Sequence, residues 1–286
     1  MQRKTLKYLI IILVCWMAAL PVPSQTSIIY STDNQISSSL INDIYQDHKG
    51  FIWIATEYGL NMFDGNKYTC YYHIDNDSTS LLDNYIHSLF EDREGNFWIC
   101  SLGGLMKYDY RTNTFSELPL YNKSVRVHPH IRQVIESKNG DIWIASSGEG
   151  AFKISRGEQK GIRVEDLDKP DFIYLSSILE DDSGNIWLGA ENNGLLCYNP
   201  TTRQSKLFQK PFISENNISV LTKDDAGNIY IGTLKGGVNV YNPQTSQITQ
   251  LPYHGRFDLQ IKTLSFIQNN LYIGLSLIHI SEPTRP

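Results

Sequence analysis

Two neighbouring carboxylates stand beside a glycine and a tryptophan in the stretch DDSGNIWLG, residues 181–189. Asp181 and Asp182 in such a setting could ligate a metal ion or serve as a general acid and base, since both chemistries need carboxylates held in a loop. The stretch recurs, however, at DHKGFIWIAT (47–56), DREGNFWICS (92–101), SKNGDIWIAS (137–146) and DDAGNIYIGT (224–233), with a weaker copy, IQNNLYIGLS (267–276). A single active site does not need such copies, so the recurrence favours a structural role.

The spacing of the copies predicts the elements that carry them. Successive aromatic residues of the motif, from Trp53 to Tyr272, follow one another by about 44 residues, which is the length of one four-stranded propeller blade. Each unit contains an aliphatic stretch before the acidic turn, a β-branched and aromatic run after it, a third strand after a glycine and a less regular fourth strand. The sequence therefore predicts an all-β protein, a β-propeller of four-stranded blades with five complete blades and a partial sixth. We place these repeats near 40–74, 85–118, 130–164, 174–208, 217–250 and 260–274.

The D-x-x-G pattern has a plain explanation in turn geometry. A type I turn favours aspartate at its first position, where the carboxylate accepts backbone N–H groups, and glycine at its fourth position. The aromatic residue of each copy then packs between blades and contributes a large apolar area. We predict turn and packing roles for Asp47, Gly50, Trp53, Asp92, Gly95, Trp98, Gly140, Trp143, Asp181, Gly184, Trp187, Asp224, Gly227 and Tyr230.

The two ends of the chain need separate treatment. Residues 1–24 begin with Arg3, Lys4 and Lys7 and continue with an apolar run that ends at Leu20, which predicts a signal peptide cleaved after Ser24; an uncleaved anchor is the alternative. The propeller then covers 25–274, and the non-repeat tail 275–286, LSLIHISEPTRP, is expected to be foreign to the protein. The net charge of -5 becomes -8 without the first 24 residues, which disfavours binding to nucleic acid.

Ligand recognition is expected where the repeats differ. The connections from the second to the third strand, and from the fourth strand to the next blade, lie at one end of each blade and vary between copies, while the D-x-x-G turns at the other end are nearly constant. Aromatic and hydrogen-bonding side chains in these loops are the groups that would hold a polar ligand. The candidates are Glu57, Tyr58, Arg126, His128, His130, Glu149, Glu191, Asn192, Lys235, His254 and Arg256. His128 and His130 lack a third ligand at a recognisable spacing, so neither a metal nor another cofactor is expected.

The stretches QDHKGFIWIATEYGLNMFDGNKYTCYY and SLLDNYIHSLFEDREGNFWICSLGGLMKYD resemble two-component regulator propeller repeats at the start of the sensor region of hybrid two-component systems. The resemblance extends from about Tyr30 to about Gly274. It implies a periplasmic, oligosaccharide-sensing segment of a receptor with two seven-bladed propellers, anchored in the inner membrane and controlling genes for polysaccharide use. A second propeller and a membrane-linked histidine kinase would be its partners within the parent chain, and a homodimer is an option for the full-length receptor. No phosphoacceptor or ATP-binding motif occurs here, so this segment is not expected to be an enzyme.

Two other function classes fit the same repeats. An exported propeller could bind a partner protein through its variable loops. Streptogramin lyase-like propellers carry similar repeats, and a lyase would need a clustered histidine and glutamate, for which His128, His130 and Glu149 are the candidates.

Overall fold

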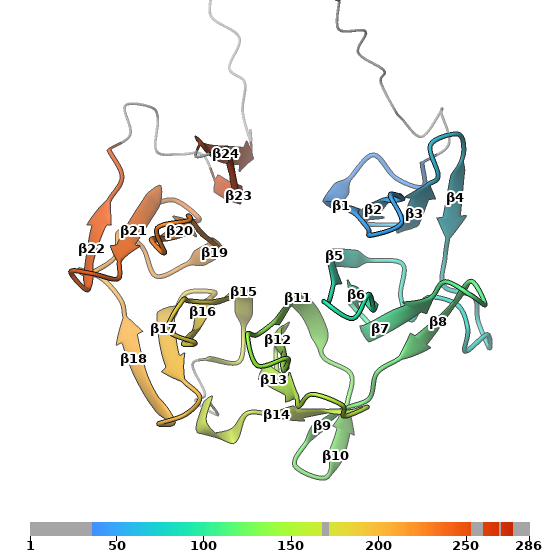
Figure 1. The fold of residues 1–286 in the computed structure, drawn as a ribbon, viewed down its shortest axis with the longest axis horizontal. Coiled ribbons are helices and arrows are strands. Elements are labelled where there is room, and N and C mark those ends of the chain that lie inside the picture. The colour runs from blue at the N-terminus through green and yellow to red at the C-terminus, as the bar shows by residue number, and fades with distance from the viewer. Residues whose placement is uncertain (1–35, 168–171, 253–259, 269, 277–286) are drawn as a thin grey trace, which may run out of the picture.

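The computed structural model describes residues 36–167, 172–252, 260–268 and 270–276. Six β-sheets follow one another along an arc around a central opening, and the arc is open between β1 and β24 (Figure 1). The predicted propeller architecture is thereby confirmed. The predicted signal peptide, the tail from residue 277 and the candidates His254 and Arg256 lie outside the described residues.

The sheets are numbered here as blades 1 to 6 in chain order. Blade 1 contains β1 (Ile41–Gln46), β2 (Ile52–Thr56), β3 (Gly59–Phe63) and β4 (Tyr68–Tyr71); blade 2 contains β5 (Ile86–Glu91), β6 (Phe97–Ser101), β7 (Gly104–Asp109) and β8 (Thr114–Glu117). Blade 3 contains β11 (His130–Glu136), β12 (Ile142–Ser147), β13 (Gly150–Ile154) and β14 (Gly161–Arg163), followed by the short 3₁₀ helix η2 (Glu165–Leu167). Blade 4 contains β15 (Leu175–Glu180), β16 (Ile186–Ala190), β17 (Gly194–Asn199) and β18 (Gln204–Phe208); blade 5 contains β19 (Ile218–Lys223), β20 (Ile229–Thr233), β21 (Val238–Asn242) and β22 (Gln247–Gln250); blade 6 is described as β23 (Gln260–Ile267) and β24 (Asn270–Ser276).

Blade 3 departs from the expected four strands. The segment predicted as a loop before His130 forms a hairpin of β9 (Leu120–Asn122) and β10 (Val125–Val127), and β9 pairs in parallel with the outer strand β14. The sheet thus has six strands, in the order β10-β9-β14-β13-β12-β11. The hairpin forms because β14 is only three residues long and leaves a sheet edge that another strand can pair with.

The D-x-x-G turns have a second function that the pattern did not predict. In blade 4 the Asp181 Oδ1 accepts the backbone N–H groups of Ser183 and Asn185, at 2.9 Å each, while Oδ2 accepts the indole Nε1–H of Trp187 at 2.9 Å. The same carboxylate-to-indole bond joins Asp47 to Trp53 and Asp92 to Trp98. One aspartate therefore fixes both the turn and the orientation of the packing tryptophan.

The tryptophans pack between neighbouring blades, as apolar residues of the motif should. Trp53 contacts Phe97 of blade 2 at a ring distance of 4.8 Å, and Trp187 contacts Tyr241 of blade 5 at 4.7 Å. The small residue two positions later leaves room for the next inner strand, because a Cβ on Gly189 would lie 2.6 Å from Ile218 Cγ2. Blades 1 and 6, which border the open side of the arc, carry exposed apolar side chains: Leu40, Ile41, Ile44, Ile267 and Tyr272.

Each inner strand contains a β-bulge at its second or third residue. The pairing register shifts between the first and third residues of β1, β5, β15 and β19, and between the second and fourth residues of β11 and β23, which leaves one residue of each strand unpaired. A bulge turns a side chain away from the regular alternation and often occurs next to a binding site. The bulged residues are Asn42, His87, Arg132, Ser176, Ser219 and Lys262.

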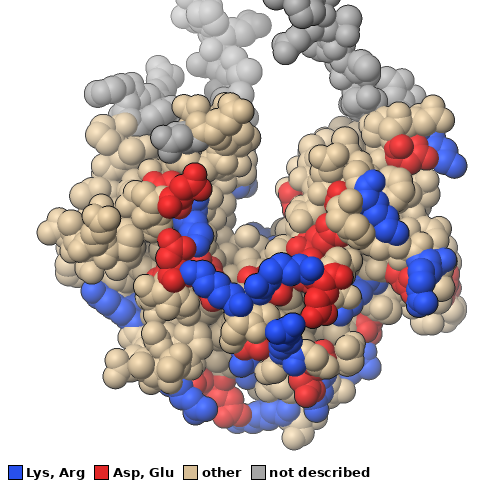
Figure 2. Space-filling model, viewed as in Figure 1, with Lys and Arg blue, Asp and Glu red and all other residues tan. Residues whose placement is uncertain are grey.

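Charged side chains connect neighbouring blades at the end that carries the D-x-x-G turns, between the first and second strands of each blade. There they border the central opening (Figure 2). Glu91, Glu136 and Glu180 end three inner strands, and each accepts the N–H of a basic turn residue in the preceding blade: His48, Arg93 and Lys138. The charges are reversed at the next junction, where Asp182 of blade 4 lies 2.7 Å from the Nζ of Lys223 in blade 5.

The reversed pair predicts a coupled effect on stability. We expect Lys223→Gln to lower the urea midpoint slightly and Lys223→Glu to lower it more, because the new carboxylate would face Asp182. In an Asp182→Asn background the difference in urea midpoint between Lys223→Gln and Lys223→Glu should shrink. With Asp182 in place, the same difference should shrink in 1 M NaCl, because salt screens the charges. Equal differences in both backgrounds would show that residues 182 and 223 are not coupled.

Candidate functional site

Polar side chains gather at the opposite end of the inner strands, where β5 and β11 begin. Tyr85 and His87 of blade 2 lie beside His130 and Arg132 of blade 3, and Glu191 of blade 4 approaches Arg132. Since the inner strands border the central opening (Figure 1), we call this group the inner mouth. It is defined by Glu57, Tyr85, His87, His130, Arg132 and Glu191.

Two imidazole rings form the centre of the inner mouth. His87 and His130 stack with their ring centroids 4.4 Å apart and their planes at 30°, and Tyr85 packs against His87 at 5.0 Å. The Tyr85 hydroxyl donates to Glu57 Oε1 at 3.4 Å. The rings therefore form a wall whose polar edges belong to three blades.

Burial and the neighbouring Arg132 together keep the two imidazoles of this wall uncharged. The Arg132 Nη1 donates to Nε2 of His87 at 3.0 Å, which requires that nitrogen to be an unprotonated acceptor. Burial and the Arg132 charge lower the pKa of His87 to about 3 and that of His130 to about 4, so both imidazoles are neutral at pH 7. The other terminal nitrogen of Arg132, Nη2, lies 3.8 Å from Glu191 Oε1, so the guanidinium charge has only a long ion pair with this carboxylate.

Two buried side-chain atoms lack a hydrogen-bond partner within the described part of the chain, Nε2 of His130 and Oγ of Ser219. His130 is the first residue of β11 and Ser219 is the bulged second residue of β19, so both stand at the same end of an inner strand. A buried polar atom without a partner is costly in a finished core and is more usual where a ligand or ordered water completes the bond.

The inner mouth contains three of the residues predicted to bind ligand: Glu57, His130 and Glu191. Three others lie apart, at the outer hairpin of blade 3: Arg126 and His128 both pair with Glu117, at 2.6 and 3.1 Å, and Glu149 accepts the side-chain amide of Asn122. The segment before His130, predicted as a connecting loop, forms the β9–β10 hairpin instead and extends the sheet outwards, so Arg126 and His128 lie away from the inner mouth.

The remaining candidates do not join the cluster. Tyr58 is exposed and packs on Tyr72, Asn192 accepts from the side-chain amide of Asn217, and the backbone N–H of Lys235 donates to Glu215.

Tyr85, His87 and Arg132 were not predicted as ligand-binding residues, because His87 and Arg132 stand inside predicted strands. One feature of the sequence could have identified them. The second residue of the inner-strand stretch is polar in every copy, as in IHSLFED and IRQVIES, and a polar residue in a strand at a constant repeat position is consistent with a bulge.

The described ranges offer neither a metal site nor a membrane-spanning helix. They contain no group of three or more His, Cys, Asp or Glu residues that could hold a metal, and no helix there is long and apolar enough to cross a bilayer. Within the described residues Cys70, Cys100 and Cys197 form no disulfide. Cys100 is fully buried, which raises its pKa to about 12, and it packs as a small apolar residue.

Comparison with known proteins identifies the repeats. Residues 35–58 and 80–103 match the two component regulator propeller family. The extracellular domain of a hybrid two-component system of B. thetaiotaomicron is 25% identical, with a TM-score of 0.75 over 87% of this chain and 34% of that chain. A second extracellular domain from that organism is 20% identical, with a TM-score of 0.74 over 87% and 36%. Virginiamycin B lyase of Staphylococcus aureus, in complex with quinupristin, shares the fold at 12% identity, with a TM-score of 0.67 over 89% and 83%.

The chain thus spans about a third of the length of the two-component extracellular domains that it resembles. No curated protein sequence matches it significantly.

Proposed function

We propose that this chain, which carries two-component regulator propeller repeats, is an extracytoplasmic sensor segment of a hybrid two-component system and that its ligand, an oligosaccharide, binds at the inner mouth. The observation that carries the proposal is the unpartnered, buried Nε2 of His130 at the centre of a polar cluster built from several blades. A ligand hydroxyl at this nitrogen would complete its hydrogen bond.

The chemistry of the inner mouth suits a hydroxyl-rich ligand. The neutral imidazole of His130 can donate or accept one hydrogen bond at Nε2, Arg132 supplies donors, and the carboxylates of Glu57 and Glu191 accept. Tyr85 adds an aromatic surface for the C–H groups of a sugar ring. Such a mixture of donors, acceptors and one aromatic ring orients a neutral polyol without leaving a buried charge unpaired.

The proposal extends to the parent receptor. A second propeller and a membrane-linked histidine kinase would follow in the same polypeptide, and the propellers would lie outside the cytoplasm. Because the inner mouth joins side chains of blades 1 to 4, a ligand there would restrain the blades relative to one another, and this restraint is the change that a downstream domain could read.

A thermal-shift screen of the chain against neutral and acidic oligosaccharides tests the proposal, because a ligand that binds only the native state raises its stability, by about 2.7 kcal/mol at a hundred times Kd. We expect at least one glycan to raise Tm, and His130→Ala and Arg132→Gln each to abolish the shift. The matched controls are His128→Ala and Arg126→Gln at the outer hairpin, which should retain it.

Three outcomes would replace the proposal. A shift that survives both inner-mouth variants would place the glycan elsewhere. The absence of any shift would favour a protein partner, and chromatographic detection of an altered glycan after incubation would favour a lyase-like enzyme.

A further inference from the structure

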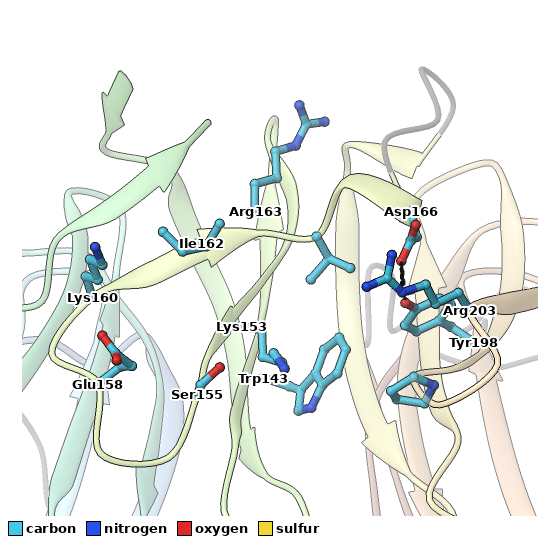
Figure 3. Close-up of a pocket in the computed structure, with 12 residues that line it drawn as sticks. Trp143, Lys153, Ser155, Glu158, Lys160, Ile162, Arg163, Asp166, Tyr198 and Arg203 are labelled. Carbon is cyan, nitrogen blue, oxygen red and sulfur yellow. Dashed lines mark hydrogen bonds and ion pairs between the residues drawn. The ribbon is translucent and has the colours of Figure 1, made fainter. Parts of the chain in front are cut away.

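A groove of about 490 Å³ lies at the junction of blades 3 and 4, away from the inner mouth. Trp143 and Val164 are among the residues that line it, and Trp143 lies between its two sides (Figure 3). One wall is the β13–β14 turn, with Ser155, Glu158 and Lys160, and the other is formed by η2 and the end of blade 4, with Asp166, Tyr198, Pro200 and Arg203.

The groove exists because blade 3 lacks a large aromatic side chain that blades 1 and 4 have. In blades 1 and 4 an outer-strand aromatic stacks on the motif tryptophan: Tyr71 on Trp53 at 5.9 Å and Phe208 on Trp187 at 5.7 Å. Val164 takes this position in blade 3, where its N–H donates to the Ala151 carbonyl at 2.9 Å. Valine is much smaller than tyrosine or phenylalanine, so the space beside Trp143 is left unfilled.

The groove is basic although the chain as a whole is acidic. Residues 153–163, KISRGEQKGIR, contain four basic residues and one acidic residue, whereas the whole chain has a net charge of -5. Lys153, Lys160, Arg163 and Arg203 line the groove. Lys153 is already paired, since its Nζ lies 3.2 Å from Asp141 Oδ2.

The acidic residues of the walls only partly offset these charges. Asp166 is already engaged, since it accepts the Tyr198 hydroxyl at 2.9 Å and lies 3.7 Å from Nε of Arg203. Burial, followed by Asp166, raises the pKa of Tyr198 to about 12, which keeps this phenol a donor. Glu158 is on the same turn as Lys160 and offsets part of its charge.

We propose that this groove is a second ligand site that takes an anionic sugar residue, one bearing a carboxylate or a sulfate. Its volume lies in the range of small-molecule sites, about 300–1,000 Å³. The N–H groups of Lys160 and Arg203 come from opposite walls and can hold the anionic group, while Ser155 and Glu158 can bind ring hydroxyls. Ile162 and the edge of Trp143 offer apolar surface to the ring. The site does not depend on the function proposed for the inner mouth.

Calorimetric titration of the chain at low ionic strength with sodium glucuronate, glucose 6-sulfate and glucose tests this site. We expect one or both anions to bind and glucose not to, and the anion that binds identifies the charged group. Lys160→Gln should weaken binding about tenfold, and Val164→Phe, which supplies the aromatic of blades 1 and 4, should abolish it while Tm stays equal or rises. The control Lys67→Gln, on the corresponding turn of blade 1, and the inner-mouth variant His130→Ala should both leave binding unchanged.

The site is refuted if neither anion binds, or if glucose binds as tightly as the anions. Loss of binding in His130→Ala would also overturn it, because the anion would then occupy the inner mouth. Should Val164→Phe fail to fold, the double variant Lys160→Gln/Arg203→Gln decides, and undiminished binding in that variant overturns the proposal.

Discussion

Replacing Trp187 by alanine is expected to lower the free energy of unfolding by about 3–5 kcal/mol, the usual cost of removing a buried tryptophan. The side chain is 1% exposed, stacks on Phe208, contacts Tyr241 of the next blade and donates its indole N–H to Asp181. Its loss would open a cavity between blades 4 and 5 and remove a donor from the turn carboxylate. Urea unfolding followed by fluorescence and circular dichroism measures the change.

The chain offers a matched control at the same repeat position. Tyr272 is the corresponding aromatic of blade 6 and is 55% exposed, so Tyr272→Ala should cost much less than Trp187→Ala. The loss in free energy of unfolding for Trp187→Phe should fall between those of Trp187→Ala and Tyr272→Ala. The phenyl ring keeps most of the packing, and Asp181 Oδ2 still accepts from the Asn185 side chain at 2.8 Å. Equal losses for Trp187→Ala and Tyr272→Ala would contradict the view that interblade packing stabilises the arc.

The second large effect concerns pH. The folded chain holds His87 and His130 neutral, with pKa values of about 3 and 4, whereas both side chains would titrate near 6.5 in the unfolded chain. Between pH 6.5 and these lower values the unfolded state binds more protons, so the two histidines lower stability as the pH falls. From pH 7 to pH 4.5 we expect their joint contribution to be a loss of about 1–3 kcal/mol, after allowance for their partial exposure to solvent.

Other groups near these rings must be considered in the same experiment. Asp83 raises the pKa of His130 and so opposes the effects of burial and Arg132, and Glu57 and Glu191 also lie close to the cluster. Asp43, in blade 1, has a pKa raised by burial to about 6. Its protonated form therefore contributes to the stability of the folded chain fully below pH 3.8, and this contribution is lost as the pH rises through 6. This sign is opposite to that of the histidines, which is why the comparison must be made between variants.

The double variant His87→Asn/His130→Asn should therefore lose less stability than the parent between pH 7 and pH 4.5, measured by urea unfolding at both pH values. His128→Asn, at the outer hairpin, serves as the control and should behave like the parent. Arg132→Gln should raise both histidine pKa values towards 6.5, which NMR titration of the imidazole protons would detect. An unchanged pH dependence in the double variant would refute the neutral imidazole pair.

The sequence repeat allowed the propeller architecture to be predicted. Because each blade buries the same kinds of side chain at the same positions, the 44-residue spacing of Trp53, Trp98, Trp143 and Trp187 was enough to predict the strands and their order. The one exception, the β9–β10 hairpin, lies outside the repeated positions and had no counterpart in other blades to reveal it. Arg126 and His128 therefore belong to a hairpin that the repeat did not predict.

The inner mouth could be predicted only in part. Sequence variation between loops identified Glu57, His130 and Glu191, but the distance between these residues along the chain contains no information on their proximity. His87 and Arg132 were not predicted to bind ligand because they stand in predicted strands. The alternation of a strand alone would assign them to one face of the sheet and would not indicate a binding role.

The sequence by itself determined the blade repeat, the turn aspartates and the interblade tryptophans, since these follow from local turn geometry and from a hydrophobic pattern repeated at fixed spacing. The tertiary structure decided which polar residues meet. The bulges aim His87 and Arg132 across blade boundaries, and the curvature of the arc brings residues some 45 positions apart into contact. The stretch DDSGNIWLG, which looked like a chemical site, proved to be part of the scaffold, and the candidate chemistry lies at the other end of the inner strands.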